Sequence, residues 1–358
     1  MCQAGHRGLT CSSQSIVRIY SWWVRALPEE FEPNAMIESL GDGWGLDVEA
    51  VHYAAVGGGS YHWVVDDLTG TRSFVTVDDL DRKPWLGDTR ESAFDGLSHA
   101  FDTAAALRAG GLGFVVGPLP TGRGETVRRL GARHTIALFP FVRGQAGQFG
   151  QFDSPDDRAA VVTMLAALHQ ATPAVASVAP RIDLDLPGRR HLEAALRDLN
   201  QRWSGGPFSE PARQALASHA SDVAELLALA DRLAADVARR STEWVVTHGE
   251  PHAANVMRAG KSRVLIDWDT VAIAPPERDL WIVVGDTTDE ALIYTDATGH
   301  EIDHVAVNFF RLLWDLKDLA SFIAVLRAPH RHSADTVKAY DGMTTCVSIR
   351  DEWAALLE

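Results

Sequence analysis

The sequence predicts an α+β protein in which a small, strand-rich N-terminal part precedes a larger, mainly helical part. Three observations support this fold class. Runs of β-branched and aromatic residues, separated by turn residues, occupy much of the chain up to residue 143. Beyond Ser154 the apolar residues recur at helical spacing. Among the later helices lies a segment from Thr247 to Trp281 that carries a dense set of polar side chains.

The strand-rich part is expected to form one five-stranded antiparallel sheet. A short helix over 33–40 comes first, and three strands follow within 51–77. Apolar residues with a period near 3.6 then predict a helix over 91–110. Segments 114–119 and 135–142 are expected to supply the last two strands.

A glycine-rich turn lies between the first two expected strands. It consists of Gly57, Gly58, Gly59 and Ser60. Glycines let a backbone approach phosphate groups closely, so these residues are candidates for covering the phosphates of a nucleotide. An ordinary hairpin turn is the alternative interpretation.

The C-terminal part is expected to be built mainly from amphipathic helices. Asp315 and Asp318 are expected close together on the surface of one of them. The expected helices span 157–170, 189–203, 211–240 and 308–327, with two more helical segments in 332–358.

The polar segment predicts a hairpin with a metal site at its open end. Two short runs flank the turn Ala259-Gly260-Lys261-Ser262, which is typical of a β-hairpin. Such a hairpin brings Asn255, before one strand, beside Asp267, after the other. An amide and a carboxylate side by side suit Mg²⁺, with Asp269 in support.

The spacing of these residues matches phosphoryl transfer. Glu250 precedes Asn255 by five positions, and Asp267 follows twelve positions later. In kinases a carboxylate at the first position orients the accepting hydroxyl and takes its proton, while Asn and Asp hold Mg²⁺ against the phosphates. Glu250 is therefore the candidate catalytic base.

The strings HGEPHAAN and IDWD carry a resemblance to a known family. They resemble the H-G-D-x-x-x-x-N and I-D-x-D signatures of the aminoglycoside phosphotransferase family of small-molecule kinases, and look most like its actinobacterial members related to spectinomycin phosphotransferase. The resemblance covers about residues 45 to 330. It implies a bilobal, protein-kinase-like fold, with a nucleotide-binding N-lobe over 26–143 and a C-lobe over 144–358. It also implies ATP and Mg²⁺ as cofactors. The family usually has Asp where this chain has Glu250.

Further roles follow from the resemblance. Phe139 and Phe141 fall at the hinge, where backbone groups bind adenine, although an apolar strand end is the alternative. His248 and Asp279 would brace the catalytic loop, and Asp279 also suits a helix N-terminus. Asp315 and Asp318 would bind amines of the substrate, unless they are two solvated acids.

One expected residue is missing from the third strand. Kinases place a lysine there that contacts the phosphates, whereas this chain has Thr76. Arg82 or Lys83 could replace that lysine, or the contact could be lost. The sequence alone does not decide between these possibilities.

Three functions are compatible with these features. The first is a kinase for an aminoglycoside or aminocyclitol antibiotic, which would confer antibiotic resistance. The second is a metabolic kinase for a sugar, an amino alcohol or a homoserine-like hydroxyl compound. The third is a pseudokinase that binds nucleotide without catalysis, which Thr76 and Glu250 would favour.

Composition narrows the partners. The 358 residues carry a net charge of −15, which disfavours nucleic acid and suits a cationic substrate. Three scattered cysteines, Cys2, Cys11 and Cys346, indicate no disulfide framework and favour the cytoplasm. No apolar run reaches the ~18 residues of a membrane span. Residues 1–25 are expected to form an N-terminal extension without fixed structure, and no oligomeric state is predicted.

Overall fold

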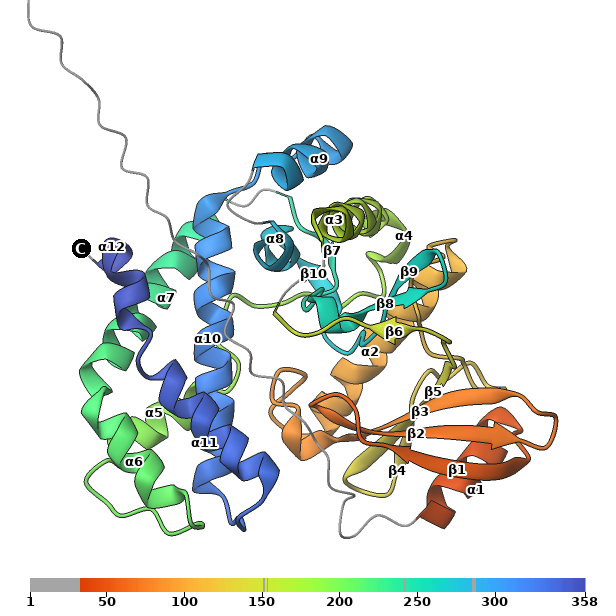
Figure 1. Ribbon diagram of the computed structural model, residues 1–358, viewed down its shortest axis with the longest axis horizontal. Helices are drawn as coiled ribbons and strands as arrows, with labels where there is room; N and C mark the ends of the chain where they lie inside the picture. Colours follow the sequence, from red (N-terminus) through yellow and green to blue (C-terminus); the bar gives the residue numbers. More distant parts are fainter. Residues whose placement is uncertain (1–32, 151, 153, 241–242, 285–287, 358) are drawn as a thin grey trace, which may run out of the picture.

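The chain folds into two lobes. A computed structural model describes residues 33–150, 152, 154–240, 243–284 and 288–357, so the expectation for residues 1–25 lies outside the described part. Figure 1 shows a lobe built on a five-stranded sheet beside a larger, mostly helical lobe. The predicted α+β class, with a small five-stranded sheet lobe and a larger helical lobe, is therefore confirmed.

The N-lobe sheet has the strand order β1-β2-β3-β5-β4, with every neighbouring pair antiparallel. Helix α1 (Pro33–Trp44) packs on one face, where Met36 contributes to a core that includes Val75 and Val77 of β3. Because strand side chains alternate, Thr76 points to the opposite face. The strands are β1 (Val48–Ala54), β2 (Ser60–Asp67), β3 (Arg72–Asp79), β4 (Arg128–Leu130) and β5 (His134–Pro140).

Segment 114–119 is not a strand of this sheet, which corrects the expectation. The fifth strand is β4 instead. Val115 forms an isolated parallel bridge with Leu265 of the C-lobe, and the Val116 amide donates to the Leu265 carbonyl at 3.0 Å. An apolar run signals burial without specifying its partner. Here Val115 and Val116 are buried against the C-lobe, whereas the amide of the exposed Leu119 donates to the Leu138 carbonyl of β5 at 2.7 Å.

Helix α2 (Arg90–Ala109) follows β3 after a short 3-10 turn, η1 (Leu80–Arg82). A reciprocal capping box between Thr89 and Ser92 fixes its start. The predicted helix over 91–110 is therefore confirmed to within one residue.

The C-lobe is organised around the long helix α10 (His304–Arg327), which contacts α5, α7, α8 and α11. The expected helix over 211–240 is two helices that break at His219. A helix was expected to begin at Asp279, where α8 lies, whereas α9 was not predicted. The other C-lobe helices are α3 (Pro155–Gln170), α4 (Thr172–Val175), α5 (Arg189–Arg197), α6 (Ser209–Ser218), α7 (Ala220–Arg240), α8 (Glu277–Val283), α9 (Thr288–Thr298), α11 (Ala334–Cys346), η3 (Arg350–Trp353) and α12 (Ala354–Leu357).

Two small sheets lie between the large sheet and the helices (Figure 1). The first pairs β7 (Val245–Thr247) with β10 (Ala272–Ala274). The second joins β6 (Gln145–Ala146), β8 (Val256–Ala259) and β9 (Ser262–Leu265). The loops at their ends carry the polar residues singled out by the sequence.

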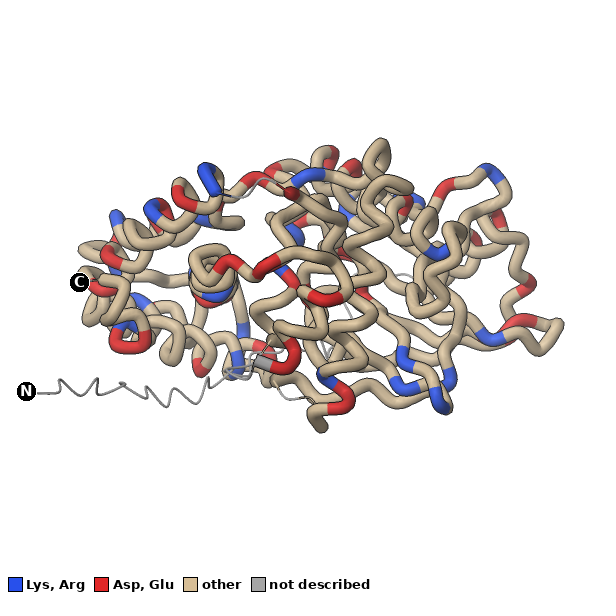
Figure 2. Tube along the Cα trace, turned by 90° about the horizontal axis from the view of Figure 1, so that it is seen from above, with Lys and Arg blue, Asp and Glu red and all other residues tan. Residues whose placement is uncertain are grey.

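Basic and acidic positions are mixed over both lobes in Figure 2. Among the described residues, no helix is both long and apolar enough to cross a membrane.

Candidate active site

The hairpin places Asn255 and Asp267 next to each other. Strands β8 and β9 pair in the register Val256↔Leu265, and Asn255 closes the short 3-10 helix η2 (Ala253–Asn255) just before β8. The Ile266 amide donates to the Asn255 carbonyl at 3.0 Å. The residue after Ile266 is Asp267, so the neighbours expected from the hairpin are brought together.

Asp267 has an unusual backbone. Its φ is +65°, and it is the one non-glycine residue of the described chain with a positive φ. Such conformations cluster at functional sites, because surrounding contacts must offset their cost. Surrounding protein and the like charge of Asp269 raise the pKa of Asp267. Because the Asp267 side chain is exposed to solvent, burial contributes little, and repulsion from Asp269 is the main cause of the raised pKa.

The donor atoms fit Mg²⁺. The Asn255 amide nitrogen donates to the Glu250 carbonyl at 3.0 Å, which leaves the amide oxygen for a ligand. Within the described chain no group of three or more His, Cys, Asp or Glu forms a complete cage. Mg²⁺ needs no such cage, because it commonly takes one or two carboxylates and fills its other positions with phosphates and water.

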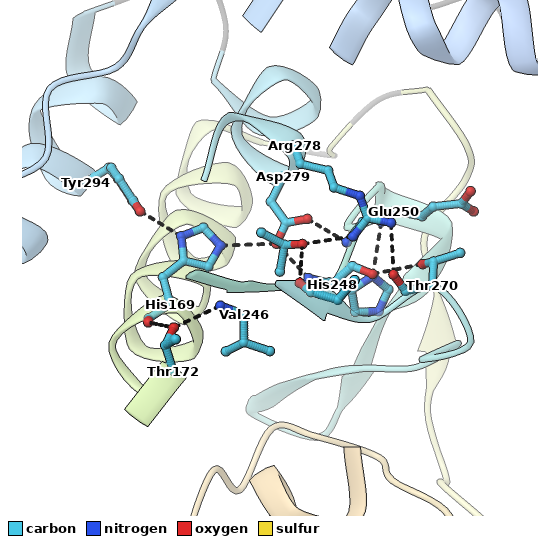
Figure 3. A network of polar contacts seen from close by, with 12 residues as sticks. His169, Thr172, Val246, His248, Glu250, Thr270, Arg278, Asp279 and Tyr294 are labelled. Atoms are coloured by element: carbon cyan, nitrogen blue, oxygen red, sulfur yellow. Dashed lines mark hydrogen bonds and ion pairs between the residues drawn. The ribbon is translucent and has the colours of Figure 1, made fainter. Parts of the chain in front are cut away.

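The loop that carries His248, Gly249 and Glu250 is anchored by Asp279, a fully buried carboxylate (Figure 3). It accepts hydrogen bonds from the amides of His248 at 2.8 Å and Gly249 at 2.6 Å, and from His169 Nε2 at 3.1 Å. Burial alone would raise the pKa of Asp279, but the His169 hydrogen bond and nearby positive charge outweigh it and lower the pKa. Asp279 lies inside α8, not ahead of it as expected, so it caps the catalytic loop and not its own helix.

His248 connects this loop to the hairpin. Its Nε2 donates to the Ile266 carbonyl at 2.9 Å, and its Nδ1 accepts from the Glu250 amide at 3.2 Å. These contacts select the neutral tautomer with the proton on Nε2. Burial lowers the pKa of His248 in agreement with that assignment. This placement matches a bracing role.

Gly249 and Arg278 were missed by the sequence reasoning. Gly249 has φ +96°, and a Cβ atom there would lie 2.4 Å from Arg278 Nη2. The Arg278 guanidinium donates to Thr247 Oγ1 and to the Thr270 carbonyl, each at 2.8 Å. The glycine between His248 and Glu250 was the signal available in the sequence.

Glu250 is held by a lysine that the sequence did not suggest. Lys317 Nζ of α10 donates to Glu250 Oε1 at 2.6 Å, and both side chains are partly exposed. Burial alone would raise the pKa of Glu250, but Lys317 outweighs it and lowers the pKa to about 2. Burial lowers the pKa of His252 to about 4, so its ring is neutral at pH 7. Lys317 is therefore the cation that lowers the pKa of Glu250.

The same face of α10 carries Trp314 and Asp318. Trp314 lies beneath the Lys317 ammonium, at 4.3 Å from its ring centroid, and its ring is 5.5 Å from that of Trp281. Asp318 is buried, which corrects the expectation of a surface residue, whereas Asp315 is partly exposed.

One carboxyl oxygen of Asp318 is buried and available to a ligand. Its Oδ2 makes no hydrogen bond with any described residue. Burial raises the pKa of Asp318 to about 8 although Lys317 opposes the shift. A buried carboxyl oxygen of this kind is stabilised when a cationic or hydrogen-bonding ligand reaches it.

The expected nucleotide residues lie in the N-lobe. Gly57, with φ +73°, Gly58 and Gly59 form the turn between β1 and β2, and Ser60 begins β2. Phe139 is buried and contacts Phe101 edge-on at 5.4 Å. The ring of Phe139 is therefore part of the core, so only its backbone groups are available to contact an adenine ring.

Phe141 follows strand β5 and is partly exposed. The guanidinium of Arg72 covers its ring at 5.5 Å. Both phenylalanines thus have packing roles, and their proximity to adenine remains a prediction.

Lys83 is also part of this region. Its Nζ lies 2.5 Å from Asp269 Oδ2 and 2.8 Å from Asp78 Oδ1, and the side chain is fully buried. Burial raises the pKa of Asp269 against the opposing effect of Lys83. The second carboxylate of the IDWD string therefore joins the two lobes.

Comparisons with known proteins agree with this geometry. Residues 88–314 match the profile of the phosphotransferase enzyme family. Protein StrN from Streptomyces griseus is 28% identical over 270 residues, which covers 73% of this chain and 79% of StrN.

Solved structures share the fold. Spectinomycin phosphotransferase APH(9)-Ia, in complex with ADP and spectinomycin, aligns with a TM-score of 0.66 at 16% identity, over 89% of this chain and 97% of that one. The microcompartment-associated aminopropanol kinase aligns with a TM-score of 0.56 at 14% identity, over 90% of this chain and 98% of that one.

Proposed function

Because the chain belongs to the phosphotransferase enzyme family, we propose that it transfers the γ-phosphoryl group of ATP to a hydroxyl of a small molecule that also carries an amine. The observation that carries this proposal is the grouping of Glu250 with the neighbouring pair Asn255 and Asp267. Cytoplasmic location, where ATP and Mg²⁺ are plentiful, is part of the proposal.

Each residue has a defined role in this reaction. Asn255 and Asp267 would hold Mg²⁺, with Asp269 in support, and the metal neutralises charge on the phosphates. Glu250 accepts a hydrogen bond from the substrate hydroxyl and so aligns its oxygen for attack. A carboxylate with a pKa of about 2 is a weak base, so it takes the proton late, after the new bond has begun to form.

The amine requirement comes from the acceptor side. Asp318 offers a buried carboxyl oxygen that has no hydrogen-bond partner among the described residues. Trp314 lies one turn before it on α10, with one ring face covered by Lys317, and the ring of Trp281 lies 5.5 Å from that of Trp314. A carboxylate and aromatic faces together favour an ammonium group. An aminocyclitol is the first candidate, supported by the fold shared with APH(9)-Ia. A smaller amino alcohol is the second, supported by the fold shared with the aminopropanol kinase.

The pseudokinase alternative has less support than the enzyme. A module that binds nucleotide without catalysis would use Asn255 and Asp267 for Mg²⁺, but it has no need for a further carboxylate, that of Glu250, on the neighbouring loop. In addition, the loop that carries Glu250 donates two backbone hydrogen bonds to the buried carboxylate of Asp279, which the ring of His169 also contacts. Such bracing is expected where a side chain must be held for chemistry.

Thermal unfolding with and without Mg–ATP tests the nucleotide site. Ligand at 100 times its dissociation constant stabilises the folded state by about 2.7 kcal/mol, a shift of several degrees. We expect this shift in the wild type and in Asp296→Asn, an exposed control on α9, but not in Asp267→Asn. Phosphoryl transfer should also fall in Asp267→Asn and stay at the wild-type level in Asp296→Asn.

Screening of acceptors by ADP release then separates the substrate classes. Spectinomycin, aminopropanol and homoserine represent the aminocyclitol, amino alcohol and homoserine-like candidates. Phosphoryl transfer that survives in Asp267→Asn would contradict the proposed metal site. A wild type that shows no Mg–ATP shift would contradict the proposed function as a whole.

A further inference from the structure

The cation between the lobes does not come from the strand position where kinases carry it. Strand β3 has Thr76 there, and its Oγ1 is 3.2 Å from His62 Nδ1 on the neighbouring strand. Lys83 follows β3 and the short helix η1, and its side chain is completely buried. Arg82, the other basic candidate, is 57% exposed and lies 3.5 Å from Asp79.

The Lys83 ammonium lies beside the glycine-rich turn. Its Nζ donates to Ser60 Oγ at 3.1 Å, and Ser60 begins β2 directly after that turn. A Cβ atom placed on Gly59 would be 3.9 Å from the same nitrogen. The turn, the ammonium and the Asp269 carboxylate, which follows the hairpin, therefore meet at one point.

The charges at this point are unbalanced. One ammonium faces three carboxyl groups, those of Asp78, Asp267 and Asp269, all of which act on it electrostatically. Asp78 Oδ2 is buried without a hydrogen-bond partner among the described residues. Buried ion pairs are poor devices for stability because desolvation offsets their attraction. Perturbed charges held together in this way are typical of functional sites.

We propose that Lys83 is the cation that contacts the phosphates of bound ATP, in place of a lysine on strand β3. Asp78 anchors the ammonium through the 2.8 Å contact, and Ser60 holds it against the glycine-rich turn. Asp269 keeps the lysine between the two lobes until the nucleotide enters. This inference rests on the proposed function, because it requires a nucleotide at this site.

The test compares two ligands that share the nucleoside and differ in the triphosphate with its bound Mg²⁺. Dissociation constants for Mg–ATP and for adenosine are measured by calorimetry on the full-length wild type, Lys83→Met and Arg82→Met. We expect Lys83→Met to weaken Mg–ATP binding at least tenfold while adenosine binding stays within twofold of the wild type. Arg82→Met should leave both constants within twofold, because Arg82 faces solvent.

Each outcome has a defined meaning. Lys83→Met that binds Mg–ATP within twofold of the wild type would overturn the inference alone. Equal losses for adenosine and Mg–ATP would also overturn it, since Lys83 would then only support the fold. If Lys83→Met does not fold, Lys83→Gln retains a hydrogen-bond donor to Asp78 and is read by the same ratio. A wild type that binds no Mg–ATP would remove the proposed function and this inference together.

Discussion

Replacing Asp279 with alanine should both destabilise the C-lobe and disable the catalytic loop. The carboxylate is fully buried and accepts from the backbone amides of His248 and Gly249 and from the ring of His169. Alanine would leave these three donors without their acceptor. A buried donor that loses its partner costs about 1–3 kcal/mol.

The two backbone donors alone therefore predict a loss of about 2–6 kcal/mol in the free energy of unfolding. For a unit of about 150–250 residues, such as the C-lobe, each kcal/mol lost from the free energy of unfolding lowers the melting temperature by about 2–4 °C. A loss near the middle of that range, about 4 kcal/mol, corresponds to about 8–16 °C. Asp279→Asn retains one acceptor oxygen, so it should lose about half as much.

Urea unfolding followed by circular dichroism measures the free energy, and thermal unfolding measures the shift. Asp296→Ala, exposed on α9, is the matched control and should stay within about 0.5 kcal/mol of the wild type. Hydrogen exchange at the His248 and Gly249 amides should accelerate in Asp279→Ala. A stability within about 1 kcal/mol of the wild type, with both amides still protected, would refute the reasoning.

Two further predictions concern the acceptor side. Lys317→Met removes the main cation that lowers the pKa of Glu250, so the pKa of Glu250 rises in this variant. Because Glu250 is proposed to act in its ionised form, kcat/KM should fall about tenfold for each pH unit below the new pKa. The pH–rate profile checks this, with Lys261→Met in the exposed hairpin turn as control, and an unchanged acid limb would contradict it. Asp318→Asn should raise the KM of an amine-bearing acceptor about tenfold or more, the range of one charge-assisted hydrogen bond, with little effect on a neutral analogue. Because burial raises the pKa of Asp318 to about 8, its ionised, amine-binding form grows with pH, and the wild-type KM should fall between pH 7 and pH 9; equal KM changes for both acceptors would count against an amine contact.

Local sequence was sufficient to predict the hairpin and the side-by-side placement of Asn255 and Asp267. The turn around Gly260 and the two short runs determine the strand register, and the register determines that Asn255 and Asp267 are neighbours. The spacing of Glu250 from Asn255 likewise lies within one loop. Short-range geometry of this kind is readable because a few backbone hydrogen bonds determine it.

The positions of several helices could also be predicted from the sequence, whereas the pairing partners of the strands could not. Apolar periodicity located α2, α3 and α10 to within a few residues. Segment 114–119 has the composition of a strand, yet it bridges to Leu265 of the C-lobe. Composition reports that a run is buried, but competition among all possible partners decides where.

The sequence by itself therefore determined the family-like motif, the two-part organisation and the neighbouring pair Asn255 and Asp267, which is proposed to hold Mg²⁺. Only the tertiary structure decided which charges face that pair. Lys83 meets Asp269 across 186 positions of chain, and Lys317 meets Glu250 across 67. No local pattern encodes such contacts, because they arise when separately folded elements pack and bring buried charges into reach of one another. For the same reason Asp318 looked like a solvated acid in the helix pattern and is a buried carboxyl in the folded protein.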